Sequence, residues 1–96
     1  MSTKQHVESM LITMGKFIRQ KRMALGLSQE ELAARANLHR TYVSDVERGN
    51  RNITIGAAVL IAEGLEIEWT ELMMAMGSPA SRPLEEEEKS LALTSY

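Results

Sequence analysis

Residues 28–49, SQEELAARANLHRTYVSDVERG, decide the fold, because two short helical segments in this stretch are separated by only two residues. Ser28 and Glu31 have the spacing of a capping box, in which each side chain accepts a hydrogen bond from the backbone N–H of the other. We therefore predict a helix of about eight residues that begins after Ser28. Its inward face is apolar and consists of Leu32, Ala33 and Ala36.

A second helix is predicted over residues 39–48, after the interruption at residues 37–38. Val43 and Val46 form its buried face. Gly49 follows it and suits the left-handed conformation in which many helices end. The outer face of this helix is polar and presents Arg40, Thr41, Ser44 and Asp45.

Outward from this stretch, apolar residues at helical spacing predict three further helices. The first covers about residues 7–25 and ends at Gly26, and two later helices cover about residues 55–64, with Thr54 as N-cap, and 69–76. Since no segment is typical of a β-strand, the predicted fold class is all-α, a domain of five helices. The inward residues expected in the 55–64 helix are Ala58, Leu60 and Ile61.

The composition limits the classes of protein that remain. Ninety-six residues suffice for one hydrophobic core, which we place in residues 1–77, with residues 78–96 as a linker and acidic tail. The sequence has no cysteine, which excludes disulfides and thiolate metal sites. No apolar run is long enough to span a membrane, and the polar N-terminus is unlike a signal peptide. We therefore expect a cytoplasmic protein.

The net charge of −2 conceals an asymmetry between the two halves of the chain. Residues 1–52 carry nine Lys or Arg against five Asp or Glu, whereas residues 53–96 carry two against eight. A basic half of this kind is expected where one face meets phosphate, but it also occurs as ordinary solvated surface. The charge alone leaves both interpretations open.

The two short helices of residues 28–49 meet the requirements of a helix-turn-helix, in which the second helix enters the major groove of DNA. The first helix must carry a small residue where the second packs closely, and Ala33 lies there. The inner faces must be apolar and the outer face of the second helix polar, as they are here. The sequence therefore predicts a protein that binds double-stranded DNA.

The segments LSQEELA (27–33) and YVSDVERG (42–49) resemble the phage-repressor-type (Xre, Cro and CI) helix-turn-helix family. The run NLHRTYVS (37–44), with RNITI (51–55), is similar to the controller proteins of restriction–modification systems. The resemblance spans about residues 10–76 and implies a lambda-repressor-like domain without a cofactor. It also implies a dimer on a palindromic operator that activates or represses its own gene and an endonuclease gene, and RNA polymerase is a further candidate partner.

The resemblance implies a role for each polar residue of the motif. Gln29 would bind a phosphate and support the second helix, and Arg40 would contact the O6 and N7 atoms of a guanine. Thr41 and Ser44 would contact bases or phosphates. Tyr42 would either place its hydroxyl on a phosphate or pack against the neighbouring helix.

Further DNA contacts are expected at the end of the second helix and in the loop that follows. Arg51 and Asn52 would contact the DNA backbone or a narrowed minor groove, and Arg48 is included in the predicted surface. Asp45 has three interpretations: it accepts from cytosine N4, repels phosphate, or holds Arg48 or Arg40 in place.

Four other polar residues have different expectations attached to them. The resemblance implies that Arg22 and Glu47 form a partly buried structural ion pair. His39 is expected at the start of the second motif helix, near a cap or a phosphate. His6 lies at the terminus, so the two histidines predict no metal site.

The second helix of a single helix-turn-helix covers few base pairs, and useful specificity normally requires two half-sites. The segment 67–76 holds more large apolar residues than one short helix needs. These residues either complete the core of one chain or form a two-fold interface, which the resemblance favours. The predicted interface residues are Ile67, Trp69, Leu72, Met73 and Met76.

A second class of function is an antitoxin or another small Xre-type autorepressor. In that case the tail, residues 84–96, would bind a partner, although a disordered tail is the simpler interpretation. No catalytic constellation can be assembled from the sequence, so we predict that the protein is not an enzyme.

Overall fold

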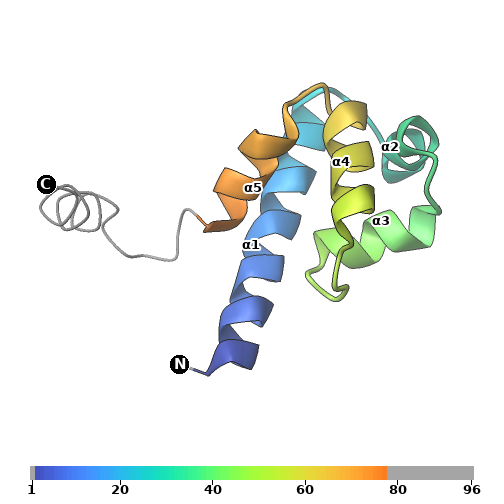
Figure 1. Cartoon of the computed structure of the whole chain (residues 1–96). Helices are drawn as coiled ribbons and strands as arrows, with labels where there is room; N and C mark the ends of the chain where they lie inside the picture. Colours follow the sequence, from blue (N-terminus) through green and yellow to red (C-terminus); the bar gives the residue numbers. More distant parts are fainter. Residues whose placement is uncertain (1, 78–96) are drawn as a thin grey trace, which may run out of the picture.

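The computed structural model describes residues 2–77, which form the five helices of Figure 1. These are α1 (Thr3–Ala24), α2 (Gln29–Ala36), α3 (Arg40–Glu47), α4 (Ile55–Gly64) and α5 (Trp69–Gly77). Within this part of the chain there is no strand, and the predicted all-α fold is confirmed. The predicted linker and tail, residues 78–96, lie outside the described residues.

Helix α1 begins at Thr3, four residues before the predicted start at Val7. The prediction began the helix at its first apolar residue, but Ser2 and Gln5 form a capping box that stabilises a polar first turn. The helix ends as predicted, because Gly26 adopts a left-handed φ of 72°. That turn lets the N–H of Leu27 donate to a carbonyl of the last helical turn.

The boundaries of the motif helices follow from their caps. Ser28 and Glu31 form the predicted capping box, with N–H to side-chain oxygen distances of 2.8 and 3.0 Å. Helix α2 ends at Ala36, and its C-cap residue Asn37 takes the left-handed conformation at φ 55°. Gly49 does the same after α3, at φ 75°. At the start of α4 the Thr54 hydroxyl accepts from the Ala57 N–H at 3.1 Å, as predicted.

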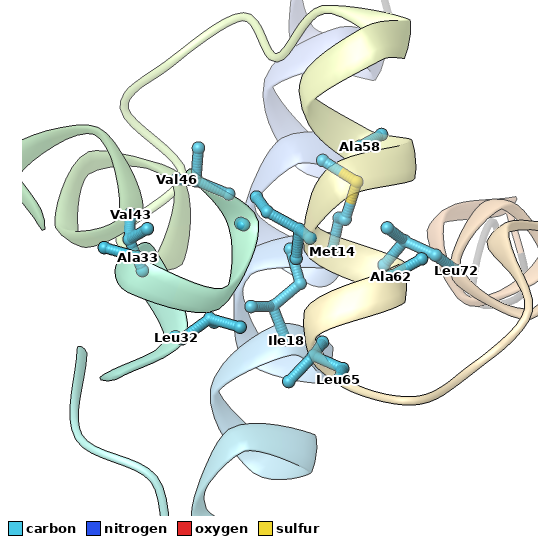
Figure 2. Close-up of a cluster of buried hydrophobic side chains, with 12 residues drawn as sticks. Met14, Ile18, Leu32, Ala33, Val43, Val46, Ala58, Ala62, Leu65 and Leu72 are labelled. Atoms are coloured by element: carbon cyan, nitrogen blue, oxygen red, sulfur yellow. The ribbon is translucent and has the colours of Figure 1, made fainter. Parts of the chain in front are cut away.

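Every helix contributes to one core (Figure 2). Helix α2 packs on α3 and α4, while α1 packs on α3 and α5. The predicted inward position of Leu60 is wrong. The residue is 38% exposed, because the buried residues of α4 lie on a different face of the helix. The core residues are Met14, Ile18, Leu32, Ala33, Ala36, Val43, Val46, Ala58, Ile61, Ala62, Leu65 and Leu72.

Helix α1 approaches the end of α3 closely at Gly15, a residue for which the sequence predicted no role. A Cβ atom on this residue would lie 2.5 Å from the carbonyl oxygen of Val46 and 2.6 Å from that of Glu47. Only glycine lets the two backbones approach so closely. Gly15 therefore places the end of α3 directly against α1.

Two negative findings apply to the part of the chain that the structure covers. No helix there is long and apolar enough to cross a membrane. Residues 2–77 also contain no group of three or more His, Cys, Asp or Glu side chains that could hold a metal ion.

Candidate nucleic-acid interface

The carboxylate of Glu47, the last residue of α3, accepts three side-chain hydrogen bonds. Arg22 of α1 donates from Nε to Oε2 at 2.6 Å and from Nη2 to Oε1 at 3.0 Å. Gln29, the first residue of α2, donates from Nε2 to Oε1 at 3.1 Å. Because hydrogen bonds to an ionised acceptor are strong, this one carboxylate fixes α3 to both α1 and α2.

The Arg22–Glu47 pair lies largely out of solvent, with 12% and 3% of the two side chains exposed. Arg22 also donates from Nη1 to the carbonyl oxygen of Leu27 at 2.8 Å. The hydrogen bond to Glu47 raises the pKa of Arg22, against the opposing effect of burial. Arg22 is therefore a structural cation, and Gln29 keeps its second amide N–H for another acceptor.

The first turn of α3 carries side chains that are accessible to a partner. Arg40 and Thr41 are both exposed. The Nε of Arg40 lies 3.8 Å from Oε1 of Glu30, and the two side chains are 62% and 77% exposed. Since such exposed pairs contribute little to stability, Arg40 can exchange Glu30 for another acceptor at small cost.

The second half of α3 holds an ionic cluster around Asp45. Its Oδ1 accepts from Arg48 Nη2 at 2.6 Å, and its Oδ2 accepts from Arg51 Nη2 at 3.2 Å. Arg48 also donates from Nη1 to the Ser44 hydroxyl at 3.0 Å. Of the residues that the sequence suggested Asp45 could hold, the structure places Arg48 against it, whereas Arg40 faces Glu30 instead.

Tyr42 connects this cluster to the loop before α4. Its ring is half-buried against the core, and its hydroxyl accepts from the Thr54 N–H at 3.4 Å. The guanidinium of Arg51 lies over the ring, 4.8 Å from its centre. His39 and Asn52 are both exposed. His39 occupies the N-cap of α3 without a side-chain capping bond.

Two basic residues counted in the N-terminal half pair with acidic residues of the C-terminal half. Arg35 donates from Nη1 to the Gly64 carbonyl at 3.1 Å and pairs with Glu66 at 3.0 Å, which connects α2 to the end of α4. Lys21 pairs with Glu71 of α5 at 3.5 Å. The charge count therefore overstates the basic surface, and no local sequence signal distinguishes these residues from Arg40 or Arg51.

The predicted interface residues of the C-terminal region do not share one environment. Leu72 is completely buried within a single chain, so assigning it to an interface was wrong, and it belongs to the core. Ile67, Met73 and Met76 are half-buried against that core. Trp69 is 49% exposed. An apolar groove that was not predicted from the sequence lies beside α5, lined among others by Val7, Leu11, Ile53, Ile55, Met73 and Met76.

This geometry, a rigidly held second helix with an exposed polar face, defines the helix-turn-helix class of DNA-binding regulators. The helix-turn-helix family model matches residues 18–72. The chain belongs to this helix-turn-helix family, which comprises regulators and not enzymes.

The more particular comparisons point to restriction–modification control proteins. Control protein C.BamHI of Bacillus amyloliquefaciens is 40% identical over 60 residues, which cover 62% of this chain and 74% of that protein. Control protein C.SmaI of Serratia marcescens is 38% identical over 60 residues, covering 62% and 71%. The similarity to controller proteins predicted from the sequence is thereby confirmed.

Solved structures agree with these relatives. The restriction-modification controller protein C.AhdI from Aeromonas hydrophila superposes with a TM-score of 0.64 at 45% identity, covering 65% of this chain and 94% of that one. The controller protein C.Esp1396I, solved as a tetramer with its natural 35 base-pair operator, gives a TM-score of 0.62 at 38% identity. That match covers 70% of this chain and 93% of the other.

Proposed function

We propose that the protein is a restriction–modification controller that binds a palindromic operator as a dimer and regulates its own gene and an endonuclease gene. Residues 1–77 serve as the DNA-binding and dimerisation domain. The relative C.Esp1396I occupies its operator as a tetramer. The antitoxin alternative is not favoured, because the relatives named above are control proteins.

The observation that carries the proposal is the contrast between the two ends of α3. Its last residue, Glu47, is held by three hydrogen bonds from α1 and α2. Its first residue, Arg40, is exposed and only loosely paired. A rigid helix with a free polar first turn is what entry into the major groove requires. In that position Arg40 would donate to the O6 and N7 atoms of a guanine, with Thr41 beside it.

The remaining polar residues would extend the contact along the DNA backbone. Gln29 would donate its free amide N–H to a phosphate at the start of α2, where the helix dipole also favours an anion. The residues that would contact phosphates or the adjacent minor groove lie on the recognition helix, at its two caps and in the loop after it: His39, Tyr42, Ser44, Arg48, Arg51 and Asn52.

The proposal is tested by measuring the dissociation constant for a duplex from the protein's own promoter and for a scrambled duplex at several salt concentrations. Arg40→Ala should lose discrimination by about tenfold to a hundredfold, since a bidentate guanine contact contributes about 1–3 kcal/mol. Arg19→Ala is the matched control, because Arg19 is exposed on α1 beside Lys16 and Met23. It should leave the ratio of the two constants unchanged. Equal discrimination by Arg40→Ala and the parent would refute the placement of α3 in the groove.

We also propose RNA polymerase as a partner during activation, and the cytoplasm as the location, because the target is DNA. In a purified transcription reaction, the protein at low concentration should increase polymerase occupancy of the endonuclease promoter. A reaction that shows only repression at every concentration would remove polymerase from the list of partners.

A further inference from the structure

We propose that Asp45 is a positioning residue that increases discrimination between operator and random DNA. It does so by holding the side chains of Arg48 and Arg51 against α3. This inference rests on the proposed function. The carboxylate divides its two oxygens between the two guanidinium groups, at 2.6 and 3.2 Å. Its side chain is 23% exposed, whereas those of the arginines are 59% and 45% exposed. The acid is thus enclosed by the cations that it holds.

Arg51 is the better defined of the two arginines, because a second group fixes it. Tyr42 and Asp45 are three residues apart on α3, so their side chains are neighbours on one face of the helix. The ring of Tyr42 supports the guanidinium at 4.8 Å from its centre, while Asp45 accepts a hydrogen bond from one Nη. Together the two residues fasten the loop after α3 onto the recognition helix.

Arg48 is fixed in a similar way, by Asp45 and by the hydroxyl of Ser44, one position earlier on α3. An arginine has five N–H donors, so each of these two side chains keeps donors for a partner. The donors that remain have a direction set by the contacts already made. Both cations are therefore arranged before DNA arrives, and do not lose a full set of rotamers on binding.

The same carboxylate weakens nonspecific binding to DNA. Affinity for random DNA comes almost entirely from the attraction of Lys and Arg to phosphate. A phosphate that meets this surface at an arbitrary register must compete with Asp45 for each guanidinium. On the operator, base contacts by Arg40 fix a register in which the held arginines meet phosphates without leaving Asp45. An element that penalises the wrong partner more than the right one increases specificity.

The test compares the parent with Asp45→Asn, which keeps the shape of the side chain and removes its charge. We expect the dissociation constant for the scrambled duplex to fall about threefold to tenfold and that for the operator to change less than twofold. The slope of log affinity against log salt concentration on scrambled DNA should steepen by about 1, for one more phosphate neutralised. Glu63→Gln, an equal change of charge at an exposed site on α4, should alter neither the ratio nor the slope.

A second background separates positioning from direct contact. When Arg48 and Arg51 are both replaced by alanine, Asp45→Asn should no longer change the ratio of the dissociation constant for scrambled DNA to that for the operator. If it still lowers that ratio, Asp45 contacts the DNA itself and the inference is overturned. Equal tightening on both duplexes in the parent background would also overturn it, because the carboxylate would then act as charge alone. Failure of the proposed function looks different, since the parent would not distinguish operator from scrambled DNA.

Discussion

Arg22 and Glu47 lie 25 positions apart in the sequence and form a two-bond ion pair that joins α1 to the last residue of α3. Gln29 at the start of α2 donates to the same carboxylate. Three helices thus meet at one acceptor. The orientation of the recognition helix depends on this acceptor as well as on the apolar core.

Arg22→Ala should lower the free energy of unfolding by about 3–5 kcal/mol, because it leaves the buried Glu47 carboxylate without its cation. Urea denaturation followed by circular dichroism measures the loss. The double variant Arg22→Met with Glu47→Leu should recover most of the stability, since no buried charge remains. A double variant as unstable as Arg22→Ala would show that the ion pair itself, and not the unpaired carboxylate, determines the cost.

Gly15→Ala should lower the free energy of unfolding by about 1–3 kcal/mol, because the new Cβ would meet two backbone carbonyl oxygens of α3. Since α3 must move away from α1, affinity for the operator should fall as well. Gly56→Ala is the matched control: nothing lies within 4 Å of its added Cβ, and alanine favours the helix. Its melting temperature should equal or exceed that of the parent, and equal losses in both variants would exclude the steric explanation.

Glu31 should make the stability of α2 depend on pH in the acid range. Hydrogen bonds from Ser28 hold the pKa of Glu31 below its ordinary value, because they favour the charged form. Its contribution is complete above the pKa of an unfolded glutamate, about 4.3, and is lost as the pH falls through the lower folded value. The stability difference between parent and Glu31→Gln should therefore shrink from pH 7 to pH 3. A constant difference over this range would contradict the assignment.

Trp69→Ala should weaken the proposed dimer by about tenfold or more in sedimentation equilibrium, because large aromatic residues dominate many interfaces. Trp69 is the single tryptophan and is half exposed in one chain. Its emission should consequently shift to the red when the parent protein is diluted. Met23→Ala on α1 is the control, since Met23 is 59% exposed beside Lys16 and Arg19. An unchanged sedimentation profile for Trp69→Ala would place the interface elsewhere.

Local sequence signals determined most of the secondary structure. Ser28 with Glu31 starts α2, Thr54 starts α4, and Gly26 and Gly49 end α1 and α3, because capping depends on residues only a few positions apart. The errors arose where a local pattern was incomplete. The capping box at Ser2 lies in a polar segment without the apolar periodicity that was used to locate helices.

Contacts between distant residues decided which side chains are free to bind. Arg35 and Arg51 have the same chemistry, yet one connects α2 to the end of α4 and the other lies on Tyr42. Leu72 was assigned to an interface and is core, because its burial depends on how α5 packs on α1. Hydrophobicity shows that a side chain will be covered, but only the packing shows by what.

The sequence by itself determined the five helices, the two-helix motif and the family, since these follow from caps, periodicity and residue identity within short segments. Only the tertiary structure decided which polar residues hold the helices together and which lie at the surface proposed to bind DNA. Gly15 permits α1 to touch α3, Glu47 collects the bonds of Arg22 and Gln29, and Asp45 holds two arginines at the surface. A charged side chain has the same chemical groups wherever it lies. Its role depends on the partner within about 3 Å, and that partner is set by packing across the whole domain.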